Sequence, residues 1–230
     1  MSIKKHFLIV LCLGWLFSNI ISAQSTYQLG VLPSINLNYK LRNDWSANFK
    51  IESRQLLQRG TFNSDVDKSY QYVLTDYSWI VARKIGLNAR LSGGYLFRFR
   101  EGQATHRLIQ QYTIIQRLPS LRLAHRIVTD QTFSDSDDTE YRLRYRLATE
   151  IPLNGQSADP KEFYIKISNE YLNSLQSAEY DLEIRVVPLL GYAVTDKQKV
   201  EFGLDYRVNS FLDKNARHSF WISLNWFFEM

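Results

Sequence analysis

The residues with the most capacity for chemistry are arginines and acids at every second position. In the run Tyr141-Arg142-Leu143-Arg144-Tyr145-Arg146-Leu147, arginine takes each even position and an apolar or aromatic residue takes each odd one. A guanidinium group is a permanent cation with a rigid fork of donors, so it suits carboxylates and other oxyanions. The pattern predicts a cationic surface that is matched by carboxylates or offered to anionic solutes.

Carboxylates follow the same period, as in Glu201/Asp205/Arg207. We interpret these residues as the lining of a lumen, where charges away from bulk water need partners. The lining candidates are Glu52, Arg54, Arg98, Arg142, Arg144, Arg146, Glu170, Glu183, Arg185, Glu201 and Arg207. Two roles stay open: a lattice of ion pairs that stiffens the wall, which the interspersed acids favour, and a lining that selects anions.

Residue patterns for catalysis are not found in the sequence, and we predict no catalytic residues, no cofactor and no enzymatic activity. A barrel acyl hydrolase would place a serine two residues after its histidine. Instead, His106 and His125 are each followed by arginine, and His218 by Ser219-Phe220. The acids around Asp135 and Glu140 are a minor alternative as a cation site, because hard cations prefer several carboxylate oxygens; we predict no metal.

The elements that position these charges are strands, because a two-residue period separates the faces of an extended chain and not those of a helix. The same alternation recurs at Phe163–Ser168, Val200–Asn209 and Phe220–Phe228. It is less clear at 70–82 and 105–116, where apolar residues fall on both faces. We therefore predict an all-β protein.

Turn-forming residues divide the chain into about eleven long strands, near 27–41, 45–58, 69–82, 86–100, 105–118, 121–133, 139–153, 162–174, 179–193, 198–210 and 217–228. Such lengths exceed the roughly 9 to 11 residues that cross a bilayer as a tilted strand. We predict an antiparallel up-and-down transmembrane β-barrel of 10 to 14 strands. Because bacterial single-chain barrels have even strand numbers, twelve is preferred, with Pro33 dividing the first segment.

The N-terminus has the pattern of a secretory signal peptide. Lys4 and Lys5 precede an apolar run, Phe7 to Phe17, that is too short to span a bilayer, and Ile20-Ile21-Ser22-Ala23 is a plausible cleavage site. We expect residues 1–23 to be removed and residues 24–230 to form the barrel. An N-terminal anchor helix is the alternative.

Charge and cysteine content exclude further classes. Removing residues 1–23 takes away Lys4, Lys5 and no acid, which lowers the formal net charge from +5 to +3. This excess is too small, and too mixed with acids, for nucleic acid. The single cysteine, Cys12, leaves with the signal, so the mature chain holds no disulfide.

Several short motifs resemble an uncharacterised outer-membrane protein family, domain of unknown function 2490. They are Ile51-Glu52-Ser53-Arg54, Gly94-Tyr95 with Arg98 and Arg100, His106-Arg107 with Gln110-Gln111, His125-Arg126, Tyr141 to Tyr145, Asn169-Glu170, and Arg185 with Gly191-Tyr192. The resemblance implies a β-barrel in the outer membrane and no particular activity. His125-Arg126-Ile127-Val128 departs from further Arg/Glu alternation, so we expect a thinner lattice there.

These inferences predict a non-enzymatic protein of the cell outer membrane, either structural or a narrow pore for small solutes. Its expected partners are outer-membrane lipid and, during insertion, the barrel-assembly machinery. The rival hypotheses are a barrel enzyme that acts on lipid, a surface adhesion or docking protein with its function in loops 59–67 and 134–138, and a soluble periplasmic β-domain. A soluble sandwich also alternates, but its polar face would carry an ordinary Lys/Glu surface rather than arginines in register with acids.

Overall fold

The computed structural model describes residues 25–62, 66–135, 137–213 and 215–230, and the signal peptide expected at 1–23 lies outside them. Within these ranges the chain forms eleven strands that close into one barrel. The strands are β1 (Thr26–Lys40), β2 (Trp45–Thr61), β3 (Gln71–Lys84), β4 (Ala89–Arg100), β5 (Gln103–Leu118), β6 (Leu121–Phe133), β7 (Glu140–Pro152), β8 (Phe163–Gln176), β9 (Glu179–Thr195), β10 (Gln198–Asn209) and β11 (Arg217–Glu229). The same ranges contain no helix with the length and apolarity needed to cross a bilayer.

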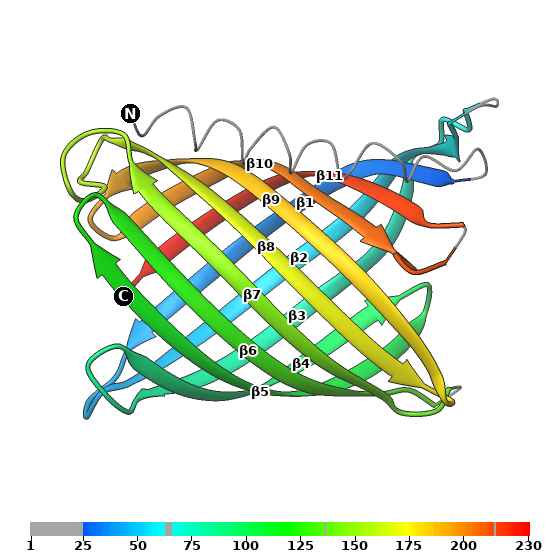
Figure 1. Cartoon of the computed structure of the whole chain (residues 1–230), viewed down its shortest axis with the longest axis horizontal. Helices are drawn as coiled ribbons and strands as arrows, with labels where there is room; N and C mark the ends of the chain where they lie inside the picture. The colour runs from blue at the N-terminus through cyan, green and yellow to red at the C-terminus, as the bar shows by residue number, and fades with distance from the viewer. Residues whose placement is uncertain (1–24, 63–65, 136, 214) are drawn as a thin grey trace, which may run out of the picture.

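The barrel is a single sheet, and its strands run obliquely to its long axis (Figure 1). Consecutive strands pair antiparallel, and β1 pairs with β11, so each strand has a partner on both sides. Closure removes the free edges that an open sheet would present. Side chains then have two destinations only, the lumen and the outside.

The barrel fold and the range of 10 to 14 strands are confirmed, but the described chain has eleven strands rather than twelve. An odd number can close because β1 and β11 run parallel, over thirteen residue pairs from Thr26–Arg217 to Asn38–Glu229. Pro33 does not divide β1. The pairs with β2 pass directly from Val31–Gln55 to Ser34–Glu52, so this residue without an N–H lies where the ladder is interrupted.

The odd strand number places the two ends of the barrel wall at opposite mouths (Figure 1). We call the end where β1 begins the N mouth and the end where β11 finishes the C mouth. The N mouth carries the connections 62–70, 101–102, 134–139, 177–178 and 210–216. The C mouth carries 41–44, 85–88, 119–120, 153–162 and 196–197. The two loops named from the sequence as candidates for adhesion or docking, 59–67 and 134–138, thus belong to the same mouth, the N mouth.

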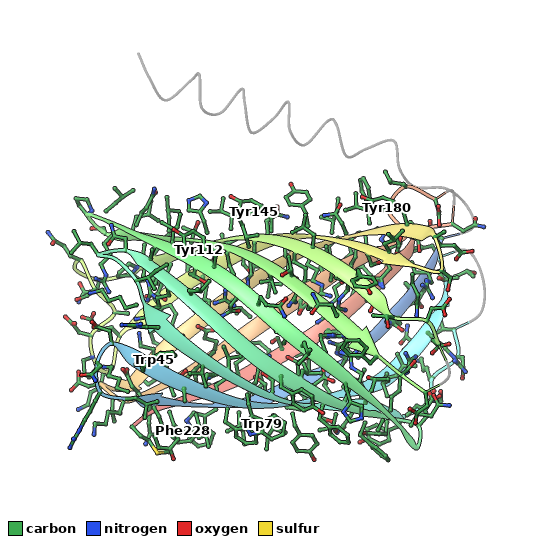
Figure 2. The ribbon with its side chains drawn as sticks, turned by 90° about the horizontal axis from the view of Figure 1, so that it is seen from below. Trp45, Trp79, Tyr112, Tyr145, Tyr180 and Phe228 are labelled. Carbon is green, nitrogen blue, oxygen red and sulfur yellow. The ribbon has the colours of Figure 1, made fainter. Side chains whose placement is uncertain are left out.

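Aromatic and aliphatic side chains cover the outer face. Trp79, Tyr145 and Tyr180 project away from the wall (Figure 2). Leu91 is 54% exposed and Phe202 is 56% exposed, although both are large and apolar. Phe227 on β11 is an exception among these aromatic residues, because alternation turns it inward, where its ring meets the Lys166 ammonium group.

Candidate functional site

The lumen is the candidate site, and β7 shows how the sequence fills it. Arg142, Arg144 and Arg146 are half-buried, whereas Tyr141 and Leu143 between them are 57% and 51% exposed. Because the wall is one sheet thick, a side chain that is buried in it can only lie on the inner face. The alternation of arginine with apolar residues therefore becomes a separation between lumen and outside.

The inner face carries a dense group of charges that we call the charge belt. Nine arginines and six carboxylates compose it. The arginines are Arg54, Arg98, Arg107, Arg126, Arg142, Arg144, Arg146, Arg185 and Arg207, and the carboxylates are Glu52, Asp76, Asp130, Glu170, Glu183 and Asp205. The cations thus exceed the anions within the belt.

Asp130 is the most buried charge of the belt, with no exposed surface. Arg142 Nε donates a hydrogen bond of 2.6 Å to its Oδ1, and Arg144 Nε lies 3.0 Å from Oδ2. Arg107 Nε is 3.5 Å from Oδ1 and donates its hydrogen bond to the Thr132 hydroxyl. One carboxylate on β6 therefore holds guanidinium groups from β5 and β7.

Two other carboxylates are each held by a pair of parallel hydrogen bonds. Arg98 on β4 donates two bonds of 2.7 Å to Asp76 on β3. Arg207 donates two bonds of 2.8 Å to Asp205, two residues earlier on β10. This fork geometry is the strongest form of an arginine–carboxylate pair, and it fixes both side chains against the wall.

Charges of the belt also interact across the lumen. Glu52 on β2 and Arg207 on β10 attract each other, although β1 and β11 separate their strands. Arg98 on β4 and Arg185 on β9, whose strands lie far apart around the barrel, repel each other. Belt residues on strands that are not neighbours therefore act on one another electrostatically.

A second polar group lies closer to the C mouth. Glu201 accepts hydrogen bonds from the Tyr164 hydroxyl at 3.0 Å and from Lys166 Nζ at 2.8 Å and 3.0 Å. Lys199 Nζ stands 5.3 Å from the centre of the Tyr164 ring. Gly191 makes room for that ring, since an added Cβ would come within 2.1 Å of it.

The structure places all eleven lining candidates on the inner face: ten of them in the charge belt, and Glu201 in the group around Tyr164. Sequence reasoning placed Asp205 in the lattice but missed Asp76, Arg107, Arg126 and Asp130 as lining residues. Where a thinner lattice was expected, near residues 125–128, the inner face carries Arg126 and the buried, apolar Val128, and neither forms an ion pair with another described residue. The lattice becomes dense again two positions beyond Val128 on the same face, where three arginines surround Asp130. Extending the two-residue period of β6 past Val128 would have found it.

Other polar residues are engaged elsewhere. The Asp138 carboxylate accepts a bond of 2.6 Å from the Ser177 hydroxyl, and in the described ranges the acids of this loop form no metal-ligating group. His125 and His218 face outward, where each bonds the hydroxyl of a tyrosine on a neighbouring strand. These histidines therefore form hydrogen bonds between strands on the outer surface.

Comparison with known protein families gives a match. The family described as "Protein of unknown function (DUF2490)" matches residues 29–221, which runs from β1 into β11 and includes the whole charge belt. No curated protein matches the chain. The resemblance seen in the arginine motifs is thus confirmed as a family relationship, and the family description names neither an activity nor a location.

Proposed function

Because the chain belongs to this family of proteins of unknown function, we propose its role from the barrel itself: it is a non-enzymatic outer-membrane protein whose charged lumen is a narrow passage for small solutes. The observation that carries the proposal is the opposite chemistry of the two faces. Large apolar side chains point outward on every side of the barrel, and ion pairs point inward.

The outer face supports the membrane part of the proposal. Exposed apolar residues occur on strands all around the barrel, for example Ile35 on β1, Leu91 on β4 and Phe202 on β10. Soluble proteins rarely leave a continuous apolar surface of this extent in water. In a bilayer the same surface contacts lipid chains, and outer-membrane lipid is the partner that it fits.

Membrane insertion in the proposed location requires export and assembly. The expected signal peptide, residues 1–23, directs the export, and the barrel-assembly machinery inserts the barrel into the membrane. No reaction is proposed, because the buried charges bind one another instead of surrounding a nucleophile.

The lumen supports the solute part. Arginine side chains of the belt keep partial contact with solvent: Arg144 and Arg185 each retain 19% of their side-chain exposure. Charged rings of this kind set the selectivity of narrow pores. A second candidate role, a closed structural barrel stiffened by the belt, is favoured by the full burial of Asp130.

The experiment uses the full chain, processed and extracted from membranes. We expect heat-modifiable gel mobility, β-rich circular dichroism and discrete conductance steps in planar bilayers. Recovery of the processed chain as a detergent-free soluble monomer would contradict the membrane proposal. A folded barrel without conductance, in which Arg144→Ala changes only the heat resistance, would contradict the passage and support the structural role.

A further inference from the structure

One row of directly paired residues winds around the inner wall from one mouth to the other. Direct cross-strand partners share a face of the sheet, so the whole row lies on the luminal side. The row, which we call the basic row, is Lys84, Arg90, Thr113, Arg126, Arg146, Glu170, Arg185, Arg207, Ser219, Gln28 and Arg59. It takes one residue from each strand, begins at the C mouth and ends at the N mouth. Seven of its eleven members are lysine or arginine, and one is an acid.

The row contains two pairs of arginines in which the two members stand directly opposite each other on neighbouring strands. The two pairs differ in how their charges are neutralised. Arg185 faces Arg207 across β9 and β10. Each has a carboxylate two residues earlier on its own strand, Glu183 and Asp205, and is bonded to it. This pair carries its own counterions.

The other pair does not. Arg126 faces Arg146 across β6 and β7, and among the described residues neither has a carboxylate within the 4.0 Å of an ion pair. Glu170 stands opposite Arg146, but its Oε1 is 3.2 Å from Arg185 and 3.8 Å from Arg144. Glu170 attracts both guanidinium groups only over a longer distance. Like charges placed directly opposite destabilise a sheet, and within the described ranges this pair has no carboxylate in direct contact to offset that repulsion.

The surroundings of this pair suit an oxyanion. Arg146 Nη2 donates a bond of 3.0 Å to the Ser168 hydroxyl, and the buried hydroxyl of Thr113 stands opposite Arg126. The flanking positions on the C-mouth side are alanines, Ala124 opposite Ala148, whose methyl groups offer the guanidinium groups no polar partner. Two cationic forks and two hydroxyls are donors that match the several oxygens of a phosphate, sulfate or carboxylate.

We infer that Arg126 and Arg146 form a binding site for a small oxyanion on the luminal wall, and that the basic row leads such anions to it from both mouths. The transport part of this inference rests on the proposed passage, and the binding part does not. The charge of the belt favours anions over cations, because the belt holds nine arginines and six carboxylates.

The binding test uses the full processed chain in detergent, with inorganic phosphate as the probe and potassium chloride at matched ionic strength as the reference. We expect phosphate to raise the melting temperature of the wild-type barrel in a saturable way, because a ligand of the folded state stabilises it by mass action. In Arg126→Gln/Arg146→Gln the apparent affinity for phosphate should fall at least tenfold. Without phosphate, this variant should melt no lower than the wild type, since the repulsion is gone.

The matched control is Arg122→Gln, which removes an inward arginine from the same strand as Arg126 but one that is paired with Glu150. It should keep the phosphate effect. A wild-type barrel that phosphate does not stabilise, or an equal phosphate effect in the double variant, would overturn the site.

Bilayer recordings separate this inference from the proposed passage. Under a potassium chloride gradient, the wild-type reversal potential should indicate anion preference, and phosphate should reduce the chloride current in the wild type and in Arg122→Gln but not in the double variant. Silent bilayers with an intact phosphate effect on melting would refute the passage and keep the site. Conductance without anion preference, together with no phosphate effect, would keep the passage and refute the site.

Discussion

Replacing Asp130 by asparagine should destabilise the barrel more than any other single change of charge in the belt. The substitution keeps the size of the side chain and removes its negative charge. Arg142, Arg144 and Arg107 all lie within 3.5 Å of this carboxylate, which has no contact with solvent. Without it, three guanidinium groups from β5 and β7, the strands on either side of β6, are left close together.

The loss of stability depends on which partners the three arginines keep after the substitution. Arg142 keeps Glu140 at 3.7 Å and Arg144 keeps Glu170 at 3.8 Å, which are long contacts. Among the described residues, Arg107 keeps only its hydrogen bond to Thr132. Removing one partner of a buried ion pair costs about 3–5 kcal/mol. We expect Asp130→Asn to lower the free energy of unfolding by this amount.

The assay is denaturant unfolding of the full chain in lipid vesicles, followed by tryptophan fluorescence. Asp67→Asn is the control, because Asp67 pairs with Arg59 at 3.4 Å with a side chain that is 57% exposed. An exposed pair contributes less than about 1 kcal/mol, so the control should unfold almost as the wild type does. If Asp130→Asn matched the control, the belt would not be a stabilising lattice and the reasoning about buried charge would be refuted.

Three further predictions concern the wall. Gly191→Val should lower the free energy of unfolding by about 1–3 kcal/mol, because the added Cβ would overlap the buried Tyr164 ring. The control Gly93→Ala should change the free energy of unfolding by less than about 0.5 kcal/mol, since in the described structure nothing lies within 4 Å of the added Cβ. Ala178→Gly should raise it by about 1 kcal/mol, since Ala178 has a φ of 64° in a tight turn; an unchanged unfolding midpoint would contradict this. Ile127→Arg, in the middle of β6 on the outer face, should cost about 2–4 kcal/mol in vesicles, and a barrel that tolerates it without loss would argue against a lipid-facing surface.

The strands were predictable because each one has two faces with different chemistry. Where both faces are mixed, the sequence pattern is weaker, and the structure explains why. Leu74 on β3 and Ile109 on β5 are apolar residues buried on the inner face, beside Asp76 and Arg107. The lumen is thus partly filled by ordinary hydrophobic packing, which hides the alternation at 70–82 and 105–116.

The lining candidates were predictable from local period, but their partners were not. Asp205 and Arg207 are two residues apart on one strand, so the sequence alone shows them together. Asp130 and Arg107 meet only through the register of β5 against β6, which pairs Arg107 with Thr132. A single sequence shows which face of the sheet each residue occupies, but it does not show how neighbouring strands are aligned. Contacts between strands and across the lumen can therefore be identified only from the structure.

Closure of the barrel is where the expectation of an even strand number failed, and its chemistry shows how an odd number is accommodated. A parallel pair of strands is slightly less stable per residue than an antiparallel one. At the seam, side chains add bonds to those of the backbone: Gln28 donates to Ser219 at 2.8 Å and Ser34 to Asn225 at 2.6 Å. Gly30 lies against the buried Trp221, which leaves no room for a side chain on β1 there. The seam is therefore a packed interface within the wall. It also makes the basic row continuous, because the parallel pairing of β1 with β11 connects Ser219 to Gln28, and the row then ends at Arg59 at the N mouth.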